Sequence, residues 1–113
     1  MKLEFEKKMR MISDLLSFCN LKGAKEFHVD LTNNDNEAIF EFKALPVTIS
    51  DKEMSILQKK LYAPRSKTME EDYWGLMGET ENFSELTLVG MMCDEADVIC
   101  KDNVLNIVLK RYN

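Results

Sequence analysis

The sequence has few of the residues that interrupt regular structure. Its 113 residues include only two prolines and four glycines. Pro46 and Pro64 flank a stretch that we expect to be helical, and no Pro- or Gly-rich linker divides the chain. A chain of this length buries on the order of 65% of the surface that its unfolded form exposes, so it can build one core without metals or disulfides. We therefore predict a single domain over residues 1–113.

Long apolar runs are missing too. The first eight residues carry charges where a signal peptide needs an apolar stretch, and no window approaches the roughly 18 apolar residues of a membrane helix. The three cysteines, Cys19, Cys93 and Cys100, are odd in number, widely spaced and set in apolar segments. We expect a cytoplasmic protein with buried, reduced thiols and no membrane partner.

Basic residues are fewer than acidic residues. Twenty acidic residues against 15 basic ones give a formal net charge of −5. This acidic field repels the phosphates of nucleic acids, so we expect no nucleic-acid partner. His28 and Asp30 share one face of a predicted strand, but no third metal ligand is near them in sequence. We therefore expect neither a metal nor another cofactor.

The first part of the chain predicts a helix followed by a β-hairpin. Apolar residues spaced alternately four and three apart indicate an amphipathic helix that ends near Lys22, with Gly23 as its C-cap. Alternating apolar residues then predict strands over 27–32 and 38–43, joined by a turn at 33–36. We expect the core to receive the apolar stripe of the helix, which consists of Phe5, Met9, Ile12, Leu16 and Cys19, widened by Met11, Leu15 and Phe18.

The middle of the chain predicts two further helices. Ser50 and Glu53 form a capping box, in which each side chain bonds the backbone N–H of the other residue, and this box begins a helix that Pro64 stops. A short helix over 70–77 follows, and residues 78–83 have the composition of a loop.

The end of the chain predicts a helix and a second hairpin. Ser84 is the N-cap of a helix that runs to about Glu95. Strands over 97–101 and 104–111 follow, with a turn at 102–103. We expect the core-facing side of the helix to consist of Leu86, Val89, Cys93 and Ala96, beside Leu88 and Met92.

This order of elements predicts an α+β fold, because the strands form hairpins and the helices are grouped between them. We expect a two-layer sandwich with a four-stranded antiparallel or mixed sheet and the helices on one face. The other face is then open to water. On that open face we expect the polar side chains His28, Asp30, Thr32, Glu41 and Lys43, with Ile39 as an apolar exception.

Two stretches resemble the GHKL ATPase family, the Bergerat-type domain of histidine kinases, gyrase-type topoisomerases and anti-sigma-factor kinases. Residues 21–31, LKGAKEFHVDL, are similar to the family's passage from its asparagine-bearing helix into the first strand. Residues 85–92, ELTLVGMM, are similar to the glycine-box helix before the last hairpin. The resemblance covers most of the chain in layout and implies an ATPase-like scaffold.

The residues that bind nucleotide in that family are replaced here. Ser17 stands at the slot of the magnesium-liganding asparagine, and Asn20 comes three residues late. Residues 44–47, ALPV, offer no carboxylate where the family's Asp reads the adenine, and Glu85 and Thr87 occupy the slots of its glycine turn. Like charges at roughly 4 Å cost about 1 kcal/mol even in water, so a carboxylate there opposes a triphosphate. We predict no useful affinity for Mg-ATP.

The stretch 70–83 combines acidic and aromatic residues and is the candidate site. Its aromatic residues either plug the space that a nucleotide fills in the family, or form a contact surface for a protein partner. A small molecule in the same space is a third interpretation, with Glu71 as a further ligand-facing group. The candidate pocket or interface residues are Tyr73, Trp74, Met77, Glu79 and Phe83.

Two functions are consistent with these patterns. The first is a noncatalytic regulatory or protein-interaction module on an ATPase-like scaffold, which binds a protein partner or associates with itself through the open sheet face. The second is a small-molecule sensor or enzyme that uses the vacated nucleotide pocket. Cys93 with His28 is a conceivable nucleophile and base, but helical spacing already explains Cys93 as a core residue, so no catalytic residue is assigned.

Overall fold

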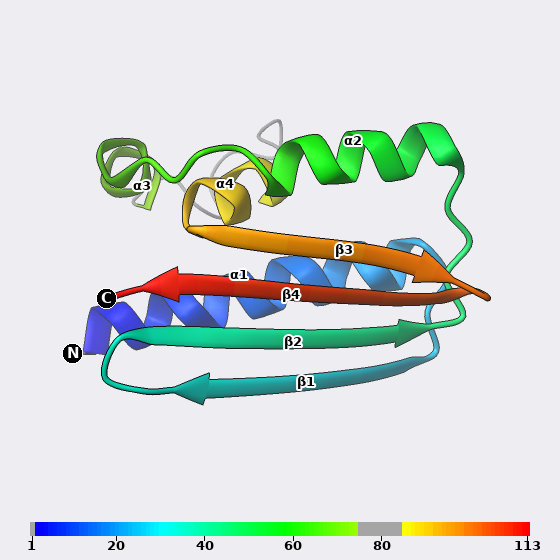
Figure 1. The fold of residues 1–113 in the computed structure, drawn as a ribbon, viewed down its shortest axis with the longest axis horizontal. Coiled ribbons are helices and arrows are strands. Elements are labelled where there is room, and N and C mark those ends of the chain that lie inside the picture. The colour runs from blue at the N-terminus through cyan, green and yellow to red at the C-terminus, as the bar shows by residue number, and fades with distance from the viewer. Residues whose placement is uncertain (1, 75–84) are drawn as a thin grey trace.

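The chain folds into one antiparallel sheet with helices on one side (Figure 1). The computed structural model describes residues 2–74 and 85–113. The strand order is β1-β2-β4-β3, and all three neighbouring pairs are antiparallel. The predicted α+β class is thus confirmed. The elements are α1 (Lys2–Leu21), β1 (Glu26–Asn33), β2 (Glu37–Leu45), α2 (Asp51–Leu61), α3 (Lys67–Trp74), α4 (Glu85–Met91), β3 (Glu95–Lys101) and β4 (Val104–Tyr112).

Tight polar turns close the two hairpins. Asn34 Oδ1 accepts hydrogen bonds from the backbone N–H groups of Asn36 and Glu37, both at 2.9 Å, which folds the first turn. Asp102 and Asn103 both have positive φ, 54° and 63°, as a two-residue hairpin turn of the favoured hand requires. Both turns were predicted, and they set the register that places alternate residues on the same face of the sheet.

Serine side chains cap the starts of α2 and α3. Ser50 Oγ accepts from the Glu53 N–H and Glu53 Oε1 accepts from the Ser50 N–H, both at 3.1 Å, so the predicted capping box is confirmed. The next helix begins at Lys67, three residues before the predicted start at residue 70. The reason is a cap that the prediction missed: Ser66 Oγ accepts from the Met69 N–H at 3.2 Å.

The border between α4 and β3 differs from the prediction. The helix expected to reach Glu95 ends at Met91, and β3 already begins at Glu95. The backbone N–H of Asp94 donates to the carbonyl of Lys110 at 2.8 Å, and its carboxylate accepts from the Tyr112 N–H at 2.6 Å. Pairing with β4 therefore takes over from the helix, and Ala96 belongs to the strand.

Helix α1 buries one edge of the predicted apolar stripe and leaves two residues of the other edge exposed. Met11, Leu15 and Cys19 are at most 1% exposed, whereas Phe5 and Met9 are 52% and 36% exposed. The prediction that Phe5 and Met9 are core residues is thus wrong. Apolar residues cover two adjacent sides of this helix, and spacing alone does not decide which of them meets the sheet.

The open face of the sheet carries the polar residues that were predicted for it. His28, Asp30, Thr32, Glu41 and Lys43 are all exposed, and Ile39 is half-buried. Between the layers, the core is centred on the inward side chains of β2 and β4. Cys19 and Cys93 are buried free thiols, as predicted, but Cys100 is only half-buried. No helix in the described parts of the chain is long and apolar enough to span a membrane.

Candidate functional site

The predicted site residues fall at the border of the described structure. Tyr73 and Trp74 form the end of α3, of which only the backbone path is described there. Met77, Glu79 and Phe83 lie outside the described residues. Three other features of the described chain can be assessed as sites: a buried ion network, a cavity among the helices and an apolar groove beside β1.

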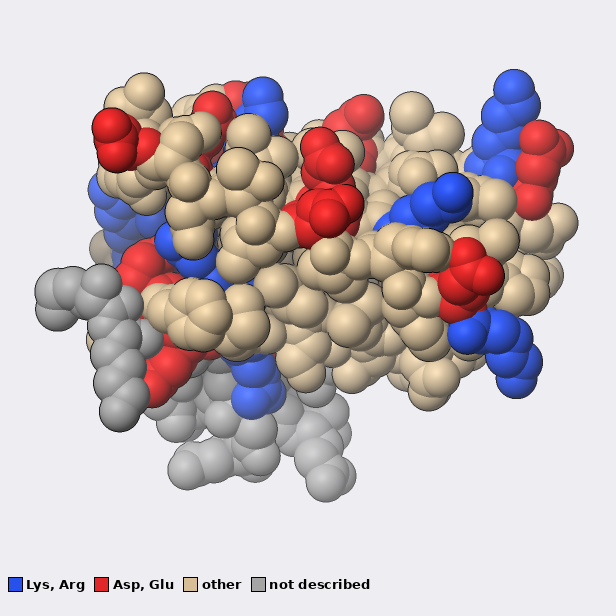
Figure 2. All heavy atoms as spheres, turned by 90° about the horizontal axis from the view of Figure 1, so that it is seen from below, with Lys and Arg blue, Asp and Glu red and all other residues tan. Residues whose placement is uncertain are grey.

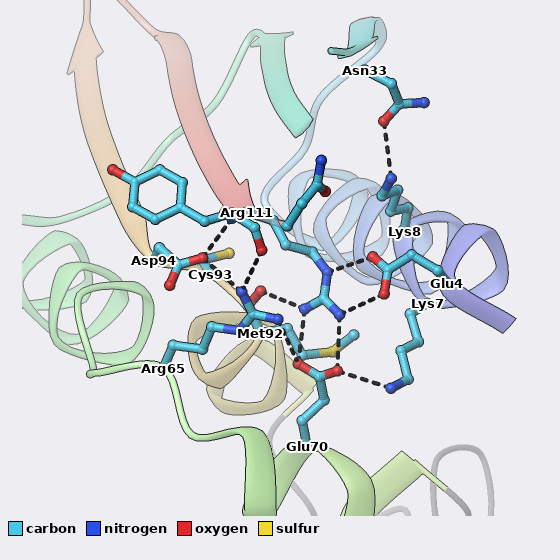
Figure 3. A network of polar contacts seen from close by, with 12 residues as sticks. Glu4, Lys7, Lys8, Asn33, Arg65, Glu70, Met92, Cys93, Asp94 and Arg111 are labelled. Atoms are coloured by element: carbon cyan, nitrogen blue, oxygen red, sulfur yellow. Dashed lines mark hydrogen bonds and ion pairs between the residues drawn. The ribbon is translucent and has the colours of Figure 1, made fainter. Parts of the chain in front are cut away.

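The ion network is centred on Arg111, which is 3% exposed and uses all five of its N–H donors (Figure 3). Its Nε and Nη2 donate to the carboxylate of Glu4 at 2.7 and 3.0 Å. Its Nη1 and Nη2 donate to the carboxylate of Glu70, both at 2.8 Å. Nη1 also donates to the backbone carbonyl of Met92 at 2.8 Å. Arg111 thereby joins α1, α3 and the end of α4 to the last strand.

Lys7 completes the charge balance around Glu70. Its Nζ donates to Glu70 Oε2 at 2.9 Å and to Glu71 Oε1 at 2.5 Å. Burial by itself would raise the pKa of Glu70, but the hydrogen bonds from Arg111 and Lys7 outweigh it and lower the pKa to about 2. Burial likewise opposes the charge of Arg111, and the two carboxylates raise its pKa instead. These groups keep each other ionised.

Arg65 extends the network to the end of the sheet. Its Nη1 donates to Asp94 Oδ2 at 2.7 Å and to the backbone carbonyl of Tyr112 at 2.9 Å. The same carboxylate oxygen of Asp94 accepts the Tyr112 N–H. The contacts of Arg65 are therefore also structural, since they tie the segment between α2 and α3 to β4.

Sequence reasoning missed this network, although one signal was present. Leu105, Ile107 and Leu109 alternate on the inward face of β4, and Arg111 continues the same alternation. A charged residue on an inward position needs buried partners. The alternation on β4 thus indicated that Arg111 is buried, but it did not identify Glu4 and Glu70 as its partners.

The possible nucleophile and base do not meet. Cys93 Sγ donates to the carbonyl of Val89 at 3.1 Å, and burial raises the pKa of its thiol to about 12. His28 lies on the open sheet face, where its Nε2 pairs with Glu26 Oε2 at 2.6 Å. Among the residues that the structure describes, no three His, Cys, Asp or Glu side chains cluster so as to hold a metal ion.

A cavity of about 250 Å³ lies between α1, α2 and α4. Lys22 and Glu53 form an ion pair at its wall. Its volume is below the roughly 300–1,000 Å³ of most small-molecule pockets. Ser17, which the sequence resemblance would place at the position of the family's metal-liganding asparagine, does not line it. The lining residues are Phe18, Lys22, Glu53, Ile56, Leu57, Lys60 and Leu86.

The largest of the three features is an open groove of about 580 Å³ between α1 and β1, which we call the α1–β1 groove. None of its lining residues is charged, and Met9 and Phe27 are 36% and 38% exposed. Figure 2, which views the molecule from the β1 side, shows a broad area without Lys, Arg, Asp or Glu below its centre, with charged side chains above it and at both ends. The groove is lined by Met9, Ile12, Ser13, Leu16, Ser17, Asn20 and Phe27.

The groove borders the unprotected edge of the sheet. At the opposite edge α2 runs beside β3 (Figure 1), and the Val98 N–H donates to the hydroxyl of Tyr62 at 3.3 Å. Within the described residues, β1 pairs with β2 only. Lys8 Nζ donates to Asn33 Oδ1 at 3.0 Å and links α1 to β1, so helix and strand form one continuous surface.

The chain matches no protein-family model and no curated protein sequence. What the α1–β1 groove can bind must therefore be inferred from the chemistry of its own residues. An apolar groove next to free backbone N–H and C=O groups suits an extended polypeptide, whose main chain needs hydrogen-bond partners and whose alternate side chains need apolar contacts.

Proposed function

We propose that this protein is a noncatalytic protein-interaction module that binds a partner chain at the α1–β1 groove, by addition of the partner's strand to β1. One observation carries the proposal: apolar side chains stand exposed beside an open strand edge. The ATPase-like scaffold that the sequence resemblance suggests would here serve binding alone.

The exposed apolar residues support this function energetically. Phe5, Met9 and Phe27 are each more than one-third exposed, at 52%, 36% and 38%. Covering such surface contributes about 25 cal/mol per Å² of apolar area. Met and Phe are enriched where proteins meet, and contiguous exposed apolar surface is a mark of an interaction site. A partner strand would add backbone hydrogen bonds to this contribution.

The chemistry of the buried groups supports binding over catalysis. Glu70 and Arg111 are ionised, and their polar atoms are bonded to one another and to Glu4, Lys7 and the Met92 carbonyl, so neither is free to exchange a proton with a substrate at neutral pH. Burial raises the pKa of Cys19 to about 11 and that of Cys93 to about 12, so both thiols stay protonated, the poorly nucleophilic form.

Selection from a phage-displayed library of random peptides tests the proposal. We expect the purified protein to enrich peptides with apolar residues at alternate positions. These peptides should bind Met9→Glu at least about tenfold more weakly, because a carboxylate would be buried in the apolar groove. The matched control is Ile99→Glu, since Ile99 is 55% exposed on the open face of β3 and lies away from the groove.

Two outcomes would contradict the function. One is that no peptide is enriched over an uncoated surface. The other is that the enriched peptides bind Met9→Glu as tightly as they bind the wild type. Circular dichroism of each variant ensures that a folded protein is compared.

A thermal-shift assay separates this function from the small-molecule alternative. A ligand that binds only the folded state raises the melting temperature. We expect Mg-ATP to leave it unchanged, because the cavity among the helices is small and Lys22 is already paired with Glu53. A concentration-dependent rise would favour the alternative.

A further inference from the structure

The free edge of β1 has a hydrogen-bond pattern that follows from its pairing with β2. The Asn34 N–H donates to the carbonyl of Glu37 at 3.0 Å and closes the hairpin. Hydrogen-bonded and non-hydrogen-bonded positions alternate along an antiparallel pair. The even-numbered residues of β1 therefore bond β2, and Phe27, Val29 and Leu31 direct their N–H and C=O groups outward.

We infer that the partner strand is β1 of a second copy of this chain, paired antiparallel about a two-fold axis at Val29. This inference rests on the proposed function and names its partner. Val29 would exchange two hydrogen bonds with the partner's Val29, and Phe27 and Leu31 would do so with the partner's Leu31 and the partner's Phe27. The two sheets would become one continuous sheet, with all helices on the same side.

Charge complementarity favours this register over the two nearest ones. On the open face it places His28 opposite the partner's Asp30, and Asp30 opposite the partner's His28, so an imidazole meets a carboxylate twice. A shift of the axis by one residue in either direction brings Asp30 opposite the partner's Asp30, or Glu26 opposite the partner's Asp30. Both alternatives set like charges against each other. Charges that are complementary between two copies of the same strand suit a symmetric interface.

The side facing the helices is complementary as well. In the same register Phe27 meets the partner's Leu31, and both lie on the inward side of the sheet next to α1. The two-fold axis brings the α1–β1 groove against its own copy. Each chain carries a formal charge of −5, which opposes association of like chains, but no charged residue lines the groove. Charge repulsion therefore does not oppose contact between the two grooves.

Sedimentation equilibrium over a dilution series tests the inference, with the full-length protein. We expect the wild type to form a dimer. His28→Asp should raise the dissociation constant at least about tenfold, because two Asp–Asp contacts replace two His–Asp contacts. The double variant His28→Asp with Asp30→Lys should restore the dimer, since each Asp then faces a Lys.

These substitutions are chosen so that the monomer still folds. Within one chain His28 lies opposite Lys43 and Asp30 lies opposite Glu41. An Asp at 28 and a Lys at 30 each face an opposite charge on β2, so loss of the dimer cannot be ascribed to a weakened hairpin. Met9→Glu should also abolish the dimer, and Ile99→Glu should not.

Each remaining outcome decides against the inference. If Ile99→Glu disrupts the dimer and Met9→Glu does not, the open sheet face is the interface. A dimer that His28→Asp leaves intact uses another register or surface. If the wild type is a monomer at every concentration while selected peptides still bind the groove, the second-copy inference fails and the proposed function stands. If peptide binding is absent too, both fail.

Discussion

Arg111 and Glu70 meet through two parallel hydrogen bonds of 2.8 Å, although 41 residues separate them in the sequence. Both side chains are less than 5% exposed. A buried pair of this kind needs such geometry, because removing two charges from water costs several kcal/mol for each ion. Here the bidentate contact, Lys7 and Glu4 supply the compensating interactions, and the result is that α3 is fixed against the end of β4.

Removal of Arg111 should therefore be strongly destabilising. In Arg111→Met, Glu70 and Glu4 lose their shared partner, and we expect the free energy of unfolding to fall by about 3–5 kcal/mol. Urea denaturation measures the free energy of unfolding of the variant and of the wild type. Lys110→Met is the matched control, because Lys110 is the preceding residue on β4 and lies on the open face. Equal losses in the two variants would show that the network does not stabilise the fold.

The network also predicts how stability depends on pH. The pKa of Glu70 is about 2 in the folded chain against an ordinary value of 4.5. The ionised Glu70 carboxylate thus contributes about 3 kcal/mol to the free energy of unfolding. This contribution is fully present above about pH 4.5 and is lost as the pH falls towards 2. The pKa of Glu4 is lowered as well, by its hydrogen bonds to Arg111, so it acts in the same direction.

Urea denaturation at several values between about pH 7 and pH 3 checks this expectation. The slope of stability against pH should flatten in Glu70→Gln. Glu6→Gln, at an exposed position on α1, serves as the control and should keep the slope of the wild type. A slope in Glu70→Gln that matches the wild type would contradict the assignment of acid sensitivity to Glu70.

Gly90 lets α4 approach α2 closely. A Cβ atom at this position would lie 1.9 Å from the backbone carbonyl oxygen of Lys60. Gly90→Ala should force the two helices apart and lower the free energy of unfolding by about 1–3 kcal/mol, although alanine is the better helix former. Thermal unfolding compares it with Ser55→Ala, at an exposed position on α2, which should change little. A Gly90→Ala variant as stable as the wild type would rule out the close contact.

The three thiols should differ in reactivity. Burial raises the pKa of Cys19 and of Cys93 to about 11 and 12, and both side chains are at most 2% exposed. Cys100 is half-buried, so we expect a thiol reagent to label it first in the native protein. Mass spectrometry of digests identifies the labelled residue, and labelling in urea provides the reference. Faster labelling of Cys19 or Cys93 in the native state would contradict this order.

The groove shows what was predictable about the candidate site. Its apolar residues were recognised in the sequence, since Met9, Ile12 and Leu16 belong to the predicted stripe of the first helix. The exposure of Met9 was not predicted. A helix with apolar residues on two adjacent sides has two ways to face a sheet, and the choice depends on contacts with distant residues. Glu4 and Lys7 reach Arg111 and Glu70 on the inward side, which turns Phe5 and Met9 outward.

Features that depend on near neighbours along the chain could be predicted from the residues alone. The capping box of Ser50 and Glu53 and the turn of Asp102 and Asn103 close within a few residues, so their patterns are visible locally. The orientation of α1, the end of α4 at Met91 and the partners of Arg111 depend instead on contacts between distant parts of the chain. Glu4 lies 107 residues from Arg111. Such contacts form only when the sheet has brought both ends of the chain together, and no local pattern specifies them.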